Sequence, residues 1–334
     1  MSAASRDNTI LSDNMNRRAV SAHTSGTVEG HQRLADMSER TPVGVIGLGA
    51  MGRGVAANLL KAGYPVVGHD LRAEAAAPLL SQGGRFAATL SELAAQTRTF
   101  VSFVVNSAQT EAVLYGPGGL ADSAQYGSVF IACSTMAPEY VKDLGQRLSR
   151  TGLALIDAPV TGGMVGAANG TLTIMAAGAP DVFAQVKPVL QCFGQRVYLL
   201  GHEPGAGAQM KVINQLLCGV HLTAAGEALA LAKRQGLPLD MTLEILCSGA
   251  AASWMLKDRG PRMVDSQHDE VTSAVDIFVK DLSLVLDATR EIRFPAGLAH
   301  AAYLAFLATT SRGLGALDDS AIMEHYANDA RTPE

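Results

Sequence analysis

The chain has 334 residues, of which 48% are hydrophobic and 17% are charged, and it contains 34 glycines. At about 150 residues for each domain, this length predicts about two domains and excludes a stapled miniprotein. The apolar content excludes disorder over the whole chain. Twenty-six Lys and Arg against 31 Asp and Glu give a net charge of -5. Since no basic excess attracts a phosphate backbone, we expect no nucleic-acid partner.

The cysteines and histidines predict neither disulfides nor a metal site. The four cysteines lie far apart without a C-x-x-C pair, which is typical of thiols in a reducing compartment. The eight histidines are scattered as well, so we expect no zinc. No apolar run approaches the roughly 18 residues that cross a bilayer. We therefore expect a cytoplasmic protein with no membrane partner.

Residues 1–40 differ from the rest of the chain. They have few apolar residues and no helical or strand periodicity, which predicts a disordered tail. A transit peptide fits less well because the stretch is not poor in acidic residues. Met37 stands just before the first ordered-looking segment, so an over-long translation start is an alternative.

Residues 41–203 alternate between short apolar runs and helical stretches. Helical spacing covers 53–61, 73–81 and 138–150. Seven runs have the length and β-branched content of strands. They are 42–46, 65–68, 100–105, 129–133, 154–156, 172–176 and 197–200. This alternation predicts an α/β domain with a mostly parallel, doubly wound sheet.

Residues 204–334 carry no further strand pattern. Residues 208–235 have apolar residues at helical spacing over about eight turns, and helical stretches continue to about residue 326. We therefore expect an all-helical second domain. The long apolar helix fits either subunit association or the core of its own domain; from the first alternative we expect a homodimer or homotetramer.

The turn after the first strand has a glycine pattern typical of dinucleotide binding. It reads Gly47-Leu48-Gly49-Ala50-Met51-Gly52. The three glycines allow a tight turn, close approach of the backbone to a pyrophosphate, and close packing of helix on strand. The negative charge of the pyrophosphate would lie at the helix N-terminus. A strand before and a helix after this turn are the required context, so the first domain is predicted to be of Rossmann type.

Asp70 indicates which dinucleotide is bound. It ends the second strand about 20 residues after the glycine turn, where a carboxylate hydrogen-bonds the ribose 2′-hydroxyl and repels a 2′-phosphate. NAD is therefore expected. Arg72 lies two residues later and could accommodate the phosphate of NADP, or it could be a solvent-facing loop residue.

Two stretches at the domain junction add a second signal. They read Asp157-Ala158-Pro159-Val160-Thr161-Gly162-Gly163 and Gly207-Ala208-Gln209-Met210-Lys211-Val212-Ile213-Asn214-Gln215. A threonine hydroxyl followed by two glycine N–H groups makes a donor set suited to a carboxylate. Together with the glycine turn, these stretches resemble the β-hydroxyacid dehydrogenase family, which includes 3-hydroxyisobutyrate dehydrogenases and tartronate semialdehyde reductases, over about residues 42 to 320.

The resemblance implies a role for each matched residue. Thr161, Gly162 and Gly163 would bind the substrate, with threonine in place of the usual serine. Lys211 would exchange a proton with the substrate oxygen, since burial can lower a lysine pKa from about 10.4 toward neutrality. Asn214 would be its polar partner on the same helix face.

The resemblance also supplies cofactor contacts beyond the glycine turn. Val105 and Asn106 follow the third main strand and Thr135 follows the fourth, at strand ends where ligands bind. Lys280 would reach the cofactor near the nicotinamide. Its alternative is a helix pair with Asp276, four residues earlier.

Residues 215–221, 253–255 and 273–282 are similar to the L-threonate dehydrogenase group, which has His where Asn214 stands. The function implied is NAD-dependent oxidation of a small hydroxy acid, a four-carbon sugar acid such as L-threonate. An NADP-dependent reductase of tartronate semialdehyde or a related aldehyde acid, a 3-hydroxyisobutyrate dehydrogenase, and a nucleotide-sensing protein without catalysis are the alternatives. Trp254 is either a wall of the substrate pocket or a packing aromatic, and Gln215 stands where many family members have a second Asn.

Overall fold

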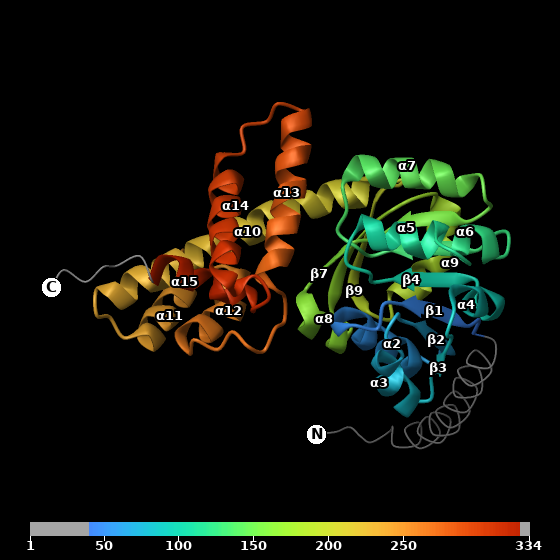
Figure 1. Cartoon of the computed structure of the whole chain (residues 1–334), viewed down its shortest axis with the longest axis horizontal. Coiled ribbons are helices and arrows are strands. Elements are labelled where there is room, and N and C mark those ends of the chain that lie inside the picture. The colour runs from blue at the N-terminus through green and yellow to red at the C-terminus, as the bar shows by residue number, and fades with distance from the viewer. Residues whose placement is uncertain (1–39, 328–334) are drawn as a thin grey trace, which may run out of the picture.

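The computed structural model describes residues 40–327, in two lobes joined by one long helix (Figure 1). The expectations for residues 1–40 lie outside this range apart from Arg40. The first lobe ends with β9 (Gly194–Gly201) and the second begins with α10 (Ala206–Arg234). The division that we expect at residue 203 falls between these two elements.

The first lobe contains one sheet with the strand order β3-β2-β1-β4-β5-β6-β8-β7, in which β9 pairs with β8. The strands before β9 are β1 (Val43–Ile46), β2 (Val66–His69), β3 (Arg85–Phe86), β4 (Thr99–Ser102), β5 (Val129–Ala132), β6 (Ala154–Asp157), β7 (Val160–Thr161) and β8 (Leu172–Ala177). All pairs are parallel except β6 with β8 and β7 with β8. The mostly parallel sheet is therefore confirmed, and all seven expected strands are present.

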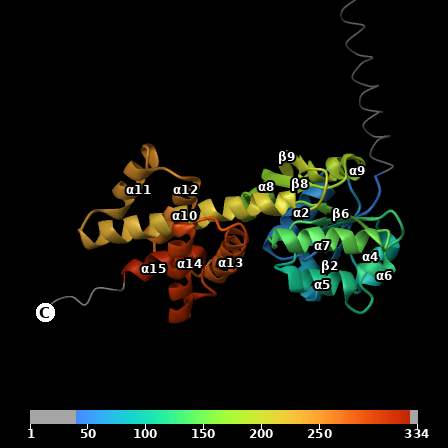
Figure 2. The ribbon, with the colours of Figure 1, turned by 90° about the horizontal axis from the view of Figure 1, so that it is seen from above.

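Helices cover both faces of this sheet. In β5, Val129 and Ile131 join one apolar core, whereas Phe130 and Ala132 join the other, as side-chain alternation along a strand requires. The covering elements are α2 (Ala50–Lys61), η1 (Ala73–Ala76), α3 (Ala77–Ser81), α4 (Leu90–Gln96), α5 (Ser107–Tyr115), α6 (Leu120–Ser123), α7 (Pro138–Ser149), α8 (Gly163–Asn169) and α9 (Pro180–Leu190). Figure 2 shows α8 and α9 on one side and α5 and α7 on the other.

The second lobe is helical, as expected. After α10 it contains α11 (Leu239–Ser248), α12 (Trp254–Val264), α13 (Val275–Glu291), α14 (Gly297–Thr309), η2 (Thr310–Leu314), η3 (Asp319–Ala321) and α15 (Ile322–Ala327). Leu222, Leu229, Phe278 and Phe306 lie in its core. Gly219 and Gly226 of α10 lie where a side chain would meet Leu282 of α13 and Met323 of α15, so glycine allows these helices to pack closely on α10.

Helix α10 corrects one expectation. Among the described residues it is the one helix long and apolar enough, by length and composition, to cross a membrane, although no such segment was expected. Half of its most apolar stretch is buried inside the protein, and its buried side chains contact both lobes. These contacts are typical of a core helix.

Candidate active site

The glycine turn lies at the point where the strand order reverses. The chain passes from β1 to β2 and β3 on one side and then returns to β4 on the other, and ligands of such sheets bind outside the strand ends at this point. Gly47 has a φ of +83°, and a Cβ on Gly52 would lie 1.8 Å from the Gly47 carbonyl oxygen. A Cβ on Gly49 would meet nothing within 4 Å. Gly47 and Gly52 thus cannot carry a side chain, whereas Gly49 faces open space. This open space fits the approach of a pyrophosphate.

Asp70 lies against the glycine turn. Its Oδ2 accepts a hydrogen bond from the Leu48 N–H at 2.8 Å, and its Oδ1 accepts one from the Arg72 N–H at 2.9 Å. The Arg72 side chain is 67% exposed, and its Nε lies 3.6 Å from Asp70 Oδ1. The carboxylate is therefore fixed next to the turn, with the arginine paired to it at the surface.

The residues after β4 and β5 divide into two groups. Val105 and Thr135 line the main cavity of the protein. The Asn106 side chain accepts a hydrogen bond from the Gln109 N–H at 2.9 Å and so caps the N-terminus of α5. Asn106 is not among the residues that line the cavity, and the structure gives it a local role in the helix.

The volume of this cavity is about 790 Å³, which falls within the range of about 300 to 1,000 Å³ that is typical of ligand sites. Its wall combines the turn residues Gly49, Ala50 and Met51 with the segment Val160 to Met164 and with Lys211. Residues from α12 and α13 complete it on the side of the helical lobe. The sites expected for cofactor and substrate thus open into one space between the two lobes.

Lys211 is buried in the cavity wall. Its side chain lies in α10, is 9% exposed, and donates a hydrogen bond from Nζ to the Val160 carbonyl oxygen at 2.8 Å. Burial lowers the pKa of Lys211, while the charge of Asp281 opposes this shift. A lysine with a lowered pKa can exchange a proton closer to neutral pH than an exposed one.

The segment that Lys211 contacts is the expected carboxylate site. Thr161, Gly162 and Gly163 all line the cavity. Gly162 and Gly163 have φ values of +123° and +61°, backbone conformations that favour glycine. The bond from Lys211 to Val160 therefore holds the amine one residue away from a concave group of donors.

A chain of polar side chains continues from Lys211 along α10 to α13. Gln215 donates to Asp281 Oδ2 at 2.5 Å, and Lys280 donates to Asp281 Oδ1 at 2.5 Å and to the Thr135 carbonyl oxygen at 3.3 Å. Lys280 therefore links the helical lobe to the segment after β5, where a cofactor contact is expected. Its alternative pairing with Asp276 is wrong, because the ion pair of Lys280 is formed with Asp281.

Gln215 and Asn214 occupy different positions from those expected. Gln215 lines the cavity, whereas Asn214 is not among its lining residues. The Asn214 amide donates to Gln215 Oε1 at 2.9 Å and to Cys218 Sγ at 3.3 Å. Asn214 therefore supports Gln215, and of the two side chains it is the glutamine that faces the cavity.

The sequence motifs predicted no role for Asp157. It is 1% exposed at the end of β6, and its Oδ2 accepts hydrogen bonds from the Gly205 and Ala208 N–H groups at 3.0 and 2.8 Å. Burial raises the pKa of Asp157 to about 6, although these backbone donors oppose the shift. The carboxyl group therefore fixes the start of the helix that carries Lys211.

Arg259 was also not among the site residues expected from the sequence. It lies in α12, lines the cavity, and forms a buried ion pair with Asp319. Trp254 lines the same cavity with a side chain that is 56% exposed, which favours its interpretation as part of the pocket wall. An arginine in the middle of a helix carries no sequence signal for a pocket, because its partner lies 60 residues away.

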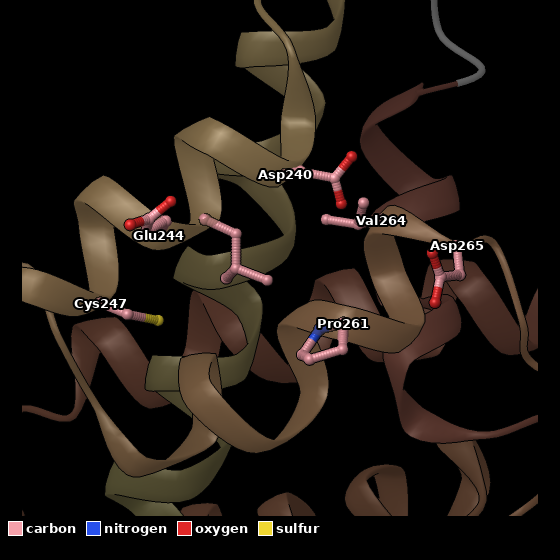
Figure 3. A pocket seen from close by; sticks show the side chains of 7 residues that line it. Asp240, Glu244, Cys247, Pro261, Val264 and Asp265 are labelled. Carbon is pink, nitrogen blue, oxygen red and sulfur yellow. The ribbon is translucent and has the colours of Figure 1, made fainter.

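A second hollow, of about 300 Å³, lies between α11 and α12 (Figure 3). Asp240, Glu244 and Asp265 line it together with Cys247. Within residues 40–327, no group of three or more His, Cys, Asp or Glu side chains is placed to hold a metal ion. Figure 1 places α11 at the end of the helical lobe away from the sheet, so this hollow is separate from the cavity with Lys211.

Comparisons with known proteins agree with this geometry. The family model for the NAD binding domain of 6-phosphogluconate dehydrogenase matches residues 42–201. The model described as NAD-binding of NADP-dependent 3-hydroxyisobutyrate dehydrogenase matches residues 205–326. The open glycine turn and the buried lysine in one cavity therefore belong to an NAD(P)-dependent hydroxyacid dehydrogenase.

Individual relatives narrow the class to a family. The chain is 43% identical over 284 residues to an L-threonate dehydrogenase of Cupriavidus necator, covering 85% of this chain and 95% of the relative. A crystal structure of 3-hydroxyisobutyrate dehydrogenase from Salmonella typhimurium is 41% identical, with a TM-score of 0.81 over 85% of this chain and 99% of that one. The complex of Psf3 with NADP+ and 2-OPP has a TM-score of 0.78 at 26% identity, over 84% of this chain and 99% of that one. The chain belongs to the 3-hydroxyisobutyrate dehydrogenase-like family of β-hydroxyacid dehydrogenases, and it is similar to the L-threonate dehydrogenases within it.

Proposed function

We propose that this enzyme oxidises a four-carbon sugar acid, L-threonate, with NAD as the hydride acceptor. The observation that supports the reaction is the 2.8 Å bond from Lys211 to Val160, which places a buried amine beside the segment Thr161 to Gly163 in the cavity that the glycine turn also lines. The L-threonate dehydrogenases at 40 to 43% identity support the substrate.

The chain's own residues bind the acid and move the proton. The Thr161 hydroxyl and the N–H groups of Gly162 and Gly163 hold the substrate carboxylate. Neutral Lys211 accepts the proton of the alcohol, and Gln215 and Lys280 keep Asp281 beside it as a counter-charge. The bound nicotinamide supplies the site that takes up the hydride from the alcohol carbon.

NAD is proposed over NADP because of Asp70. Its carboxylate is fixed next to the turn by the Leu48 N–H, where it hydrogen-bonds a ribose hydroxyl and repels a 2′-phosphate. Arg72 is paired with Asp70, which reduces the positive charge it offers to a phosphate. The NADP+ complex of Psf3 keeps NADP as the second candidate.

Measuring NADH and NADPH formation from a panel of acids tests both choices. The panel is L-threonate, D-erythronate, D-glycerate and 3-hydroxyisobutyrate, each with NAD and with NADP. We expect the highest kcat/KM for L-threonate with NAD. The Salmonella structure makes 3-hydroxyisobutyrate the second candidate, and oxidation of that acid alone would refute the sugar-acid proposal.

We also propose that the enzyme is a cytoplasmic homodimer or homotetramer. Ile213, Leu217 and Leu231 of α10 are half-exposed or more, and exposed apolar side chains of this size favour association. Light scattering after size-exclusion chromatography tests this proposal, and a monomer at micromolar concentration would contradict it.

A further inference from the structure

The helical lobe contributes a distinct part of the cavity wall. Trp254, Met255 and Arg259 line it from α12, and Thr272 and Ser273 line it from the connection before α13. None of these residues takes part in the proton transfer or cofactor binding described above. This part of the wall is therefore free to contact the rest of the substrate.

Arg259 is held rigidly in this wall. It is 8% exposed, and its Nε and one terminal nitrogen donate to the two carboxylate oxygens of Asp319 at 2.7 and 3.1 Å. The other terminal nitrogen donates to Asp258. Because Asp319 is fully buried, the guanidinium has one fixed orientation.

The guanidinium has donors left over. It carries five N–H groups, of which the bonds to Asp319 and Asp258 use three. One N–H on each terminal nitrogen has no partner in the part of the chain that the structure describes. Ser273 lines the same cavity, and its carbonyl oxygen accepts a hydrogen bond from the N–H of Asp319, the partner of Arg259, at 2.7 Å. The Ser273 hydroxyl likewise has no hydrogen bond within residues 40–327.

The charges around Arg259 favour a neutral group over an anion. Arg259 and Arg262 lie among Asp258, Asp318 and Asp319, to which they are paired, so two positive charges meet three negative ones. The charge of Arg259 is already shared between Asp258 and Asp319, so it attracts a second carboxylate less than an unpaired arginine would. Hydroxyl groups need no counter-charge and can accept hydrogen bonds from the guanidinium.

Cys218 connects this wall to the proton-transfer site. Its side chain lines the cavity from α10, one helical turn beyond Gln215. Burial raises the pKa of the Cys218 thiol, and the charges of both Lys211 and Arg259 oppose this shift. Lys211, Cys218 and Arg259 all line the same cavity, so the tail of a substrate held at Lys211 shares that space with the Arg259 guanidinium.

We propose that Arg259 and Ser273 form a subsite that binds the hydroxyl groups of an uncharged substrate tail. This inference rests on the proposed function and refines it: the enzyme selects monocarboxylic acids with a hydroxylated tail over acids with an apolar tail and over dicarboxylic acids. Arg259 is a specificity residue, because it distinguishes substrates by the tail rather than by the reacting carbon.

The test is the ratio of kcat/KM for L-threonate to kcat/KM for 3-hydroxyisobutyrate, which has no distal hydroxyl group. This ratio does not depend on the fraction of folded enzyme. In Arg259→Lys, which keeps the charge beside Asp319 but loses the spare donors, we expect the ratio to fall about ten- to a hundredfold, as for a hydrogen bond to a charged donor. Arg147→Lys is the matched control, because Arg147 also pairs with two carboxylates, those of Glu111 and Asp143, but is not among the cavity-lining residues. Its ratio should stay within twofold of wild type.

Ser273→Ala provides an independent variant in case Arg259→Lys does not fold. Its loss of a neutral hydrogen bond should lower the same ratio about three- to tenfold. Wild-type enzyme should also use L-tartrate, a dicarboxylic acid of the same length, at least ten times less efficiently than L-threonate.

Two results would overturn the subsite, and they are distinguishable. If wild-type enzyme oxidises L-threonate but the ratio stays within twofold in the folded variants, the subsite is wrong and the proposed function stands. If wild-type enzyme oxidises none of the polyhydroxylated acids, the proposed substrate is wrong and the subsite falls with it.

Discussion

Replacing Lys211 with Met tests the proposed proton transfer directly. The substitution keeps an unbranched side chain of similar length in the wall of α10 and removes the amine that donates to Val160 at 2.8 Å. A positioned proton donor or acceptor contributes about 10²- to 10⁴-fold to the rate, which is about 3 to 5 kcal/mol of transition-state stabilisation. We therefore expect kcat/KM for oxidation to fall by that factor.

The same variant should keep its stability. It loses one hydrogen bond, worth about 1 kcal/mol, but it also removes a group whose charged form is disfavoured by burial, which is why the pKa of Lys211 is lowered. The change in the free energy of unfolding should therefore stay within about 1 kcal/mol. NADH binding should change little, since the glycine turn and Asp70 are unaltered.

The assay measures NADH formation for kcat/KM, NADH fluorescence for cofactor binding, and thermal unfolding for stability. Lys233→Met is the matched control, because Lys233 lies in the last turn of the same helix and is exposed. It should behave as wild type in all three measurements. If Lys211→Met retained kcat/KM within threefold of wild type, the assignment of the lysine would be refuted.

Further predictions concern pH, the cofactor and stability. Because burial lowers the pKa of Lys211 and oxidation requires the neutral amine, kcat/KM for oxidation should rise with pH and level off below about 10.4; a profile that Lys211→Met leaves unchanged would contradict this. Gly49→Ala should unfold at the wild-type temperature, since the methyl group meets no protein atom within 4 Å, but fluorescence titration should show NADH binding weakened at least about tenfold. Asp70→Ser should lower the ratio of kcat/KM with NAD to that with NADP about tenfold or more, and an unchanged ratio would remove Asp70 as the determinant. Asp157→Ala leaves two buried N–H groups without their acceptor, so urea unfolding should show a loss of about 1 to 3 kcal/mol, and a loss under 0.5 kcal/mol would argue against its capping role.

The fold was predictable where the pattern extends over several residues. The four-residue strand β5 has apolar side chains on both faces, and such runs can be recognised without knowledge of their neighbours. The strands β3 and β7 have two residues each and were missed, because so short a segment contains no period. The antiparallel pairing of β8 with β6 and β7 depends on tertiary contacts and has no local signature.

The site was predictable where its residues are contiguous. The glycine turn and the segment Thr161 to Gly163 appear as motifs because backbone geometry fixes their order in the chain. Asp157 and Arg259 act through partners 48 and 60 residues away. Sequence spacing on α10 also favoured Asn214 over Gln215, and only the side-chain directions show that the glutamine lines the cavity.

Helix α10 has a consequence for anyone who recombines this enzyme with its relatives. Ala208 packs in a core of the sheet, whereas Val212, one turn later, packs in the core of the helical lobe. The change from one core to the other therefore falls at Lys211. A chimera joined between β9 and α10, where the chain itself offers a loop, would take the lysine and its hydrogen-bond acceptor Val160 from different parents. A joint placed after Val212 would keep Asp157, Val160 and Lys211 together, so a substrate-exchange experiment should begin there.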